Sequence, residues 1–480
     1  MNGSGVEFQR AAAEAIADTT HSANREQLGR KLPEARKEAI DAFGGDATFD
    51  AMRRDFKQLR EHAQRHLGHY LEQFVAKARE NGCQVHFARD SDELNRHVLD
   101  ICIGAKAERV IKGKSMVTEE TGLNVALEDA GLAVRETDLG EYILQEAGEK
   151  PSHIVAPALH KTKADIRELF LRQHALGERD LESSAAMVAE ARRLLREDFL
   201  HADVGIIGSN ALIAETGHSL LVTNEGNGDL CANLPDTLVI CTTLDRLLPR
   251  ASDGMAMLRL LARSTTGQAL SCYTSFYSGP RKHHDVDGPT AVHFVILDNQ
   301  RSDILASDYR EMLHCLRCGA CLNHCPIYMT AGGHAYDSVY PGPMGSVLTP
   351  LLTSLEEAEA LPNACTACGR CEEVCPANIP LPGLLRDLRA EQFTTRVSPA
   401  RWRAGLKLHA WLVLRPRLYR AVTGAAVRLM HRLGRKRGVI RHLPFAGGWL
   451  TARDLPAPAK QSFLSAYLDQ QRKASRGAKP

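Results

Sequence analysis

The middle of the chain, between residues 80 and 300, alternates short apolar runs with longer amphipathic stretches. Short runs rich in Val, Ile and Leu are typical of buried strands, whereas apolar positions three and four residues apart predict helices. This alternation favours an α/β domain with a largely parallel sheet. The expected strands are Val85–Ala88, Arg109–Ile111, Ala133–Glu136, His153–Ala156, Val204–Ile207, Leu212–Glu215, Leu220–Thr223, Thr237–Cys241 and Val292–Leu297. The expected helices are Asp92–Ile103, Lys163–His174 and Ser184–Leu200.

The first 75 residues have apolar positions at helical spacing, as at Phe49, Met52 and Phe56. This pattern predicts helices that pack against other parts of the molecule and carry no chemistry of their own. Pro33 is expected to interrupt one of them, because proline cannot donate the backbone hydrogen bond that a helix interior requires.

Residues 301–390 hold two groups of cysteines with helical patterning around them. The stretch between the groups, residues 332–350, is rich in Gly and Pro and is expected to be a loop. Residues 351–360 follow it with helical spacing. The predicted organisation is a helical region at 1–75, an α/β domain at 76–300, a helical cysteine-bearing module at 301–390 and a separate region at 391–480.

Composition narrows the class of protein. With 480 residues, 44% hydrophobic and 25% charged, the chain has the balance of a globular protein, which excludes disorder, collagen and a coiled coil for the chain as a whole. No stretch has ~18 uninterrupted apolar residues, so no transmembrane helix is expected. Met1–Arg10 lacks the basic and apolar segments of a secretion signal. We therefore expect a cytoplasmic protein, in which thirteen cysteines indicate metal binding or catalysis rather than disulfides.

Charge is distributed unevenly along the chain. Residues 391–480 contain 19 Lys and Arg against three acidic residues, a net charge of +16, so with +2 overall the remainder carries −14. From Leu418 the apolar positions follow one helical face and arginines the other, which predicts a basic amphipathic helix. Such a helix could dock onto an acidic partner or the acidic remainder of the chain, or lie on the inner face of an anionic membrane as a peripheral contact. No nucleic-acid-binding motif accompanies it, and nucleic acid is not expected as a partner.

Eight of the thirteen cysteines form two runs with the same spacing. The first is Cys315-x2-Cys318-x2-Cys321-x3-Cys325-Pro326, and the second is Cys365-x2-Cys368-x2-Cys371-x3-Cys375-Pro376. This spacing is typical of bacterial-type ferredoxins, in which the fourth cysteine of each run ligates the other cluster. A structural zinc site would use two pairs of cysteines and leave thiolates over. We predict two [4Fe-4S] clusters, the first held by Cys315, Cys318, Cys321 and Cys375 and the second by Cys365, Cys368, Cys371 and Cys325.

Two adjacent clusters indicate an electron relay rather than a structural metal. Arg317 and Arg370 lie inside the runs. A cation beside a cluster favours its reduced form, although both arginines could instead face solvent. The other five cysteines have apolar surroundings and are expected to pack in the core.

The α/β domain has polar segments where apolar runs end, the position at which open α/β sheets gather ligands. Gly113-Lys114-Ser115 resembles part of a phosphate loop, but Glu108 stands where that motif requires glycine. No Gly-x-Gly-x-x-Gly follows a strand, no flavin signature is present, and no catalytic residue can be named. The candidate substrate-binding residues are Lys114, Ser115, Glu119, His160, Glu215, Asn224 and Glu225.

Five of these polar segments and the two cysteine runs together resemble the lactate-utilisation protein B family over about residues 20 to 470. The segments are Lys-Ser-Met-Val-Thr-Glu-Glu at 114–120, Glu-Thr-Asp-Leu-Gly-Glu at 136–141, His-Lys-Thr at 160–162, Ala-Glu-Thr-Gly at 214–217 and Thr-Asn-Glu-Gly-Asn at 223–227. The resemblance implies a LUD domain similar in fold to the sugar-phosphate isomerase and CoA-transferase group, joined to a helical dicluster ferredoxin-like module.

The same resemblance implies an electron-transfer subunit in the oxidation of L-lactate to pyruvate, relaying electrons toward the respiratory chain. It also implies two partners, a Cys-rich redox subunit and a second, smaller LUD-domain protein. Two other functions stay open on the residues alone: a self-sufficient 2-hydroxy-acid oxidoreductase, and a redox-sensing binding protein.

Overall fold

The structure is a computed structural model that describes residues 5–177, 179–443, 450 and 453–477. Residues 1–4, the start of the segment considered for a secretion signal, lie outside the described residues. The chain forms two compact units that meet at Val397 and Ser398. Among the described residues, no helix is both long and apolar enough to cross a membrane.

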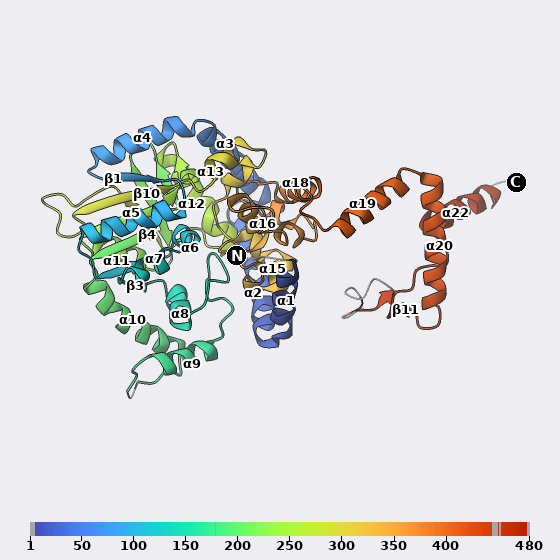
Figure 1. The fold of residues 1–480 in the computed structure, drawn as a ribbon, viewed down its shortest axis with the longest axis horizontal. Helices are drawn as coiled ribbons and strands as arrows, with labels where there is room; N and C mark the ends of the chain where they lie inside the picture. The colour runs from blue at the N-terminus through green and yellow to red at the C-terminus, as the bar shows by residue number, and fades with distance from the viewer. Residues whose placement is uncertain (1–4, 178, 444–449, 451–452, 478–480) are drawn as a thin grey trace. The chain divides into compact units, whose positions relative to one another are not determined.

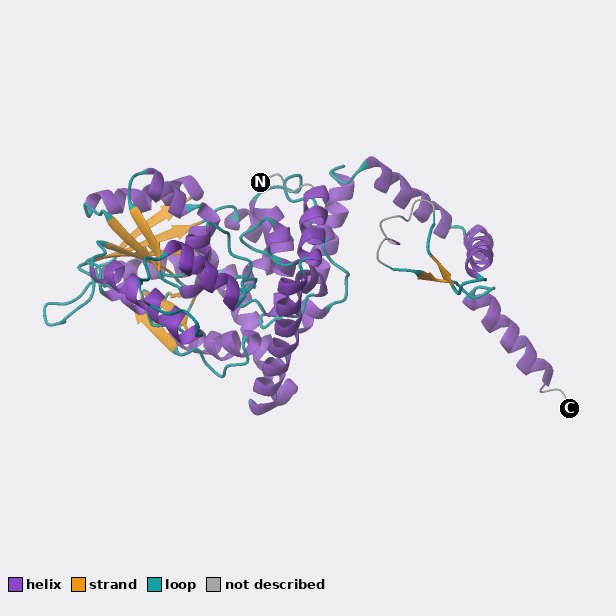
Figure 2. Cartoon of the chain, turned by 90° about the horizontal axis from the view of Figure 1, so that it is seen from below, coloured by secondary structure: helices purple, strands orange, loops and turns teal. Residues whose placement is uncertain are grey.

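A six-stranded sheet forms the centre of the first unit, with every neighbouring pair of strands parallel (Figures 1 and 2). Its order is β1-β10-β7-β4-β2-β3. The strands are β1 (Gln84–Ala88), β2 (Arg109–Lys112), β3 (Ala133–Glu136), β4 (Val204–Gly208), β7 (Thr237–Thr243) and β10 (Ala291–Leu297). The α/β class and the parallel sheet are therefore confirmed.

Both faces of this sheet are buried, which is why its strands read as continuous apolar runs. Successive side chains of a strand point to opposite faces, so Val239 packs in one apolar cluster and Ile240 in another. The register places Ile240 beside Ile207 on β4 and Phe294 on β10, all within the same cluster. The covering helices include α4 (Leu67–Glu80), α5 (Ser91–Gly104), α6 (Met116–Thr121), α7 (Leu123–Asp129), α8 (Leu139–Ala147), α10 (Ser184–Leu200) and α11 (Asn227–Asn233), and α9 (Lys163–Gln173) packs on α8 and α10.

A second sheet of four strands has the order β8-β5-β6-β9. Its strands are β5 (Ala211–Ile213), β6 (His218–Thr223), β8 (Leu247–Leu248) and β9 (Tyr273–Tyr277). The β5–β6 hairpin turns at Gly217, whose φ is +70° and whose Cβ, if present, would lie 2.4 Å from the backbone nitrogen of Ala78. The sequence did not predict β9, because its side chains are partly or fully exposed and show no buried apolar run.

The N-terminal helices and the cysteine module share one apolar core with the second sheet. Arg53 on α3 shows how closely they join, because its Nε donates to the carbonyl of Cys375 at 2.8 Å. The N-terminal helices are α1 (Gly5–Ala17), α2 (Thr19–Ala42) and α3 (Gly45–Arg65), and α12 (Ala251–Thr265) packs against α2 and α3. The cysteine module contains α13 (Arg301–Ala306), α14 (Ala320–Asn323), α15 (Pro326–Ala331), α16 (Gly342–Leu352), α17 (Arg370–Glu373) and α18 (Leu381–Thr394).

Three local predictions are corrected by the structure. His153–Ala156 forms no strand, because the ring of His153 accepts the backbone N–H groups of Val155 and Ala156 and holds the segment as a loop. The Gly- and Pro-rich stretch at 332–350 is not all loop, since Pro343 lies in the first turn of α16, where a missing N–H costs nothing. As part of the same correction, α16 ends at Leu352 and turns follow it, so the helix expected at 351–360 does not form. Pro33 lies inside α2 without ending it.

The second unit contains α19 (Ala400–Val413), α20 (Pro416–Gly434) and α22 (Phe463–Gly477), with a short ladder of β11 (Val439–Ile440) and β12 (Leu455–Pro456). The predicted basic amphipathic helix is α20. Its apolar side chains are largely exposed, with Leu418 at 39% and Leu429 at 59%. No residue of α19 is buried.

Candidate functional site

The first cysteine run follows a 3₁₀ turn at Arg310–His314. The backbone is left-handed at Arg317 (φ 54°) and again at Gly319 (φ 80°). This path lets the backbone N–H of Arg317 donate to the sulfur of Cys315 at 3.3 Å. Cys325 then caps the N-terminus of α15, and its sulfur accepts the N–H of Tyr328 at 3.5 Å.

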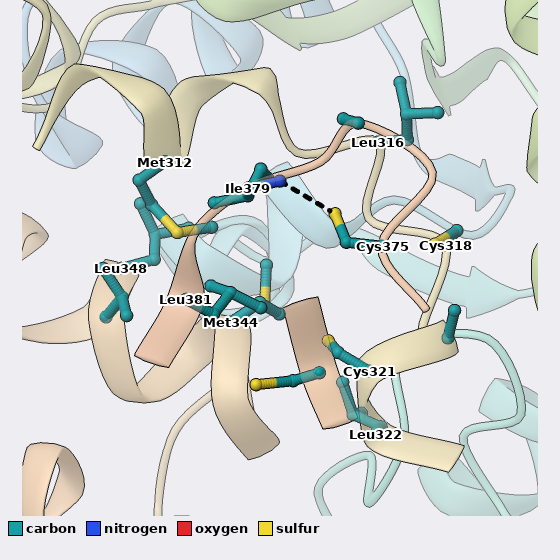
Figure 3. Packing of buried hydrophobic residues seen from close by; sticks show 14 of the residues in the cluster. Met312, Leu316, Cys318, Cys321, Leu322, Met344, Leu348, Cys375, Ile379 and Leu381 are labelled. Atoms are coloured by element: carbon teal, nitrogen blue, oxygen red, sulfur yellow. Dashed lines mark hydrogen bonds between the residues drawn. The ribbon is translucent and has the colours of Figure 1, made fainter. Parts of the chain in front are cut away.

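The second run repeats this backbone path. Ala367 (φ 57°) and Gly369 (φ 81°) are left-handed, and the N–H of Ala367 donates to the sulfur of Cys365 at 3.2 Å. The sulfur of Cys375 accepts the N–H of Ile379 at 3.5 Å, the contact drawn in Figure 3. The equal spacing in sequence therefore produces equal local geometry, with backbone donors directed at the sulfurs of both runs.

The eight thiols gather into two groups, each of which takes its fourth member from the other run. Burial raises the pKa of Cys318 to about 12, with a further contribution from the nearby thiols of Cys315 and Cys375. Burial likewise raises the pKa of Cys371 to about 12, with Cys325, Cys365 and Cys368 as neighbours. Figure 3 shows Cys318, Cys321 and Cys375 among Met and Leu side chains. Cys321 is close to the thiols of its own group and to Cys371, so the two groups are neighbours.

These groups fit the chemistry of [4Fe-4S] ligation. Buried thiols crowded together resist ionisation because each thiolate would face low dielectric and other negative charges. Cationic iron would supply the missing counter-charge, and the N–H groups directed at sulfur would stabilise the thiolates further. Within the described part of the chain, no three His, Cys, Asp or Glu side chains converge closely enough to hold a single metal ion. The groups differ in exposure, since Cys318 and Cys321 are buried whereas Cys368 is exposed.

Arginines hold the backbone of both runs, a buried one at the first and a partly buried one at the second. Arg246, only 5% exposed, donates from Nη1 to the carbonyl of Cys315 at 3.0 Å. Arg389 donates from Nη2 to the carbonyl of Cys365 at 3.1 Å. The two arginines inside the runs differ, because Arg317 is half-buried over the ring of Tyr340 whereas Arg370 is exposed and pairs with Glu373. Arg317 therefore stands close to its cysteines as a cation, and Arg370 faces solvent.

A cavity of about 310 Å³ lies where the carboxyl ends of β2 and β4 meet the first cysteine run. Most of its wall comes from residues 113–117, 207–210, 221–225, 227–228, 261–262, 265–266 and 316–318. Four candidate residues from the sequence, Lys114, Ser115, Asn224 and Glu225, line it. Cys318 lines it as well, so the α/β domain and the cysteine module share one hollow.

The other three candidates are not among the residues that line the cavity. Glu119 pairs with the buried Lys112 at 2.8 Å. His160 interacts with Ser152 and Glu149, both at 2.8 Å. Glu215 accepts the backbone N–H at the start of α12.

The sequence missed two charged residues that do line the cavity, Arg246 and Asp138. Arg246 lies in a 3₁₀ turn, Leu244–Arg246, with no recognisable motif around it, so no local signal could have identified it. Asp138 belongs to a polar segment that was recognised, and it caps α8 by accepting the N–H of Gly140 at 3.0 Å. Cys272 is a related correction, since it is exposed rather than packed in the core.

A buried charge cluster lies beside the cavity at the end of β2. Burial alone would lower the pKa of Lys112, but the carboxylates of Glu136 and Glu119 outweigh it and raise that pKa. Glu141 has no such partner: burial, reinforced by Glu136, raises its pKa well above the usual range, and neither of its carboxyl oxygens makes a hydrogen bond. Burial therefore favours the neutral carboxylic acid form of Glu141.

Comparison with known proteins agrees with this architecture. A family model for the LUD domain matches residues 71–297, and one for a 4Fe-4S dicluster domain matches residues 311–379. The fold and the site thus define an iron–sulfur protein built from a LUD domain and a 4Fe-4S dicluster domain.

The relatives specify the family. The chain is 42% identical over 416 residues to the lactate utilization protein B of Oceanobacillus iheyensis, covering 86% of each chain. It is 41% identical to that of Shouchella clausii, covering 87% of this chain and 88% of the other. It is 40% identical over 91% of each chain to the protein named uncharacterized electron transport protein YkgF of Escherichia coli K12. The chain belongs to the lactate utilization protein B family.

One solved structure also matches, that of a DUF162 family protein from Deinococcus radiodurans. It covers 48% of this chain and 98% of its own, with 14% identity and a TM-score of 0.28. No argument about this chain is taken from it.

Proposed function

We propose that this chain is the electron-transfer subunit of an L-lactate oxidation complex, relaying electrons through two [4Fe-4S] clusters toward the respiratory chain. The first cluster would be held by Cys315, Cys318, Cys321 and Cys375, and the second by Cys365, Cys368, Cys371 and Cys325. The observation that carries the proposal is the gathering of the eight thiols into two neighbouring groups, each completed by a cysteine from the other run.

Two clusters suit this reaction because oxidation of a 2-hydroxy acid to a 2-oxo acid releases two electrons, and each cluster accepts one. The difference in exposure supports a direction for the relay. The first group borders the cavity through Cys318, and the second reaches the surface through Cys368. Electrons would enter at the first cluster and leave to a partner at the second.

The partners proposed from the family are a Cys-rich redox subunit and a second LUD-domain protein, as the name lactate utilization protein B suggests for the relatives. The test is the rate at which the assembled complex reduces its acceptor with L-lactate. Replacing Cys318 and Cys368 together by Ser should abolish that rate, whereas Cys272→Ser, an exposed cysteine outside both runs, should leave it unchanged. Undiminished reduction by the double variant would contradict the proposal.

We further propose that the basic second unit docks onto an acidic partner subunit, because α20 exposes an apolar face beside its arginines. Peripheral contact with the inner face of the membrane is the competing role. Flotation of the isolated full chain with anionic vesicles distinguishes the two roles. Salt-sensitive flotation would assign α20 to the membrane. No flotation, together with pull-down of the chain by the partner subunit, would assign α20 to the complex.

A further inference from the structure

The cavity between the α/β domain and the first cysteine run has the composition of a ligand site. Its volume of about 310 Å³ is at the small end of the range for organic ligands and too small for a dinucleotide. The walls carry three cations, Lys114, Arg246 and Arg317, against two acids, Asp138 and Glu225. The cavity should therefore bind an anion, and the small excess of positive charge favours an anion with a single charge.

Arg246 supplies a specific anchor for such an anion. Its side chain is 95% buried, and Nη1 is used by the carbonyl of Cys315. Nη2 is enclosed and forms an ion pair with a carboxylate oxygen of Asp245, 3.2 Å away. These two contacts fix the guanidinium in the cavity wall, where its charge can pair with an anion in the cavity.

The acids in the cavity wall favour a ligand that also carries a hydroxyl group. Lys114 is held at the wall by a 2.7 Å bond from Nζ to the carbonyl of Val155 and keeps further donor capacity. The carboxylates of Asp138 and Glu225 can accept a hydroxyl proton. The same two acids would repel the dianion of a phosphate ester, which offers them no proton. The polar set thus matches a monoanion with its own donor more closely than a phosphate ester.

From this geometry we infer that the cavity binds a small monocarboxylate bearing a 2-hydroxyl group, with its carboxylate near Arg246 and Lys114 and its hydroxyl donating to Asp138 or Glu225. The inference rests on the proposed function and extends it, because the ligand would lie against Cys318, in the run proposed to hold the first cluster. The LUD domain would then be the substrate-binding part of this chain rather than only a support for the clusters.

The test is equilibrium dialysis of the anaerobically purified, cluster-loaded full chain against radiolabelled L-lactate and pyruvate, with inorganic phosphate as competitor. Arg246→Gln and Lys114→Gln should each weaken binding by about tenfold or more, since each removes a charged hydrogen-bond donor. Arg370→Gln removes a cation from the other cysteine run, outside the cavity, and should bind as the unmodified chain does. Iron content and visible absorbance establish that each variant keeps its clusters. Lys114→Gln keeps the test valid if the buried Arg246 variant does not fold.

Two results would overturn the inference: no saturable binding of L-lactate by the unmodified chain, or binding that Lys114→Gln leaves unchanged. Pyruvate that binds as tightly as L-lactate would overturn the contact of the hydroxyl with Asp138 and Glu225, and phosphate that binds as tightly would overturn the assignment to a carboxylate. These outcomes are separable from failure of the proposed function. A chain that binds L-lactate through Arg246 and Lys114 but passes no electrons in the complex would contradict the relay alone.

Discussion

At the scale of single residues, the cysteine runs are shaped by backbone that only a few residues adopt readily. Arg317 and Ala367 are left-handed although neither is glycine, a conformation that costs roughly 1–2 kcal/mol for a residue with a Cβ. In return each directs its own N–H at a cysteine sulfur two residues earlier. Local strain is thus offset by donors placed where thiolates would need them.

The proposed cross-ligation of two clusters predicts how cysteine substitutions combine. Cys318→Ala with Cys375→Ala removes two ligands from one proposed cluster, so the chain should keep about four of its eight iron atoms. Cys368→Ala with Cys375→Ala removes one ligand from each cluster and should leave far less iron. Iron and acid-labile sulfide analysis of anaerobic preparations measures this. The reverse order of iron contents would show that each run holds its own cluster.

Arg246 is expected to tune the first cluster. A buried cation next to Cys315 favours the more negative, reduced cluster, so Arg246→Gln should lower the midpoint potential of the first cluster by tens of millivolts. EPR-monitored redox titration measures the shift. Arg370→Gln is the control, because that side chain is 52% exposed and water screens its charge. Equal shifts in the two variants would contradict a special role for Arg246.

At the scale of elements, charged side chains gather at the carboxyl end of the parallel sheet and are buried there. Lys112 ends β2 with its side chain fully enclosed, and Glu136 ends the neighbouring β3 2.7 Å away. Glu141, one turn into α8, is enclosed beside them without a hydrogen bond. Parallel strands bring their ends to one edge, which is why side chains from β2, β3 and the start of α8 form one cluster there.

This arrangement gives Glu141→Gln a stability effect that depends on pH. The pKa of Glu141 is raised by burial, so as pH rises above about 4.5 the unfolded chain loses its proton while the folded chain keeps it, and the free energy of unfolding falls. Glutamine does not ionise, so Glu141→Gln removes this fall in the free energy of unfolding. The apparent Tm of Glu141→Gln should therefore exceed that of the unmodified chain by a few degrees at pH 8 and by less at pH 5.

Thermal scans at matched rates under anaerobic conditions measure this difference. Glu128→Gln offers a control on the nearby helix α7, since that side chain is exposed and its variant should show no pH-dependent gain. A gain for Glu141→Gln that is constant from pH 5 to pH 8 would show that the carboxyl ionises normally in the folded chain.

At the scale of the whole molecule, one buried network joins the α/β domain to the cysteine module. Arg301 on α13 binds both carboxylate oxygens of Glu120 on α6, at 2.9 and 2.7 Å, and donates to Asp245 at 3.1 Å. Tyr340, ahead of α16, donates to the same Glu120. Opposing charges hold Arg301 protonated despite burial, and its pKa is raised. These contacts explain why residues up to Val397 form one compact unit.

Removing one partner of this network should be costly. Glu120→Gln leaves Arg301 with an incomplete counter-charge in a buried site, and the free energy of unfolding should fall by roughly 3–5 kcal/mol. Chemical denaturation under anaerobic conditions, followed by circular dichroism, measures the change. Glu93→Gln breaks a pair with the largely exposed Arg89, which water screens, and should cost far less. Similar losses in both variants would mean that the buried network is not what joins the two parts.

Features that depend on neighbours along the chain were predictable from the sequence. Spacing alone identified both cysteine runs, because ligands to one cluster must follow one another at short intervals. The central strands were recognisable because both faces of the sheet are buried, which leaves continuous apolar runs. β9 was missed because its side chains are largely exposed and form no apolar run. The segment at His153 was predicted as a strand from its apolar residues, although the His153 ring holds it as a loop.

The cavity was decided by tertiary structure alone. Lys114 and Asn224 stood at strand ends that the sequence had marked, but nothing in their spacing indicates that they share a hollow with Cys318, about 200 and 100 residues further along. No sequence motif around Arg246 could identify it, because its role depends on a hydrogen bond to the carbonyl of Cys315, which is distant in sequence. Local periodicity reports which side of an element is buried, whereas the meeting of distant segments follows from how complete layers pack against each other.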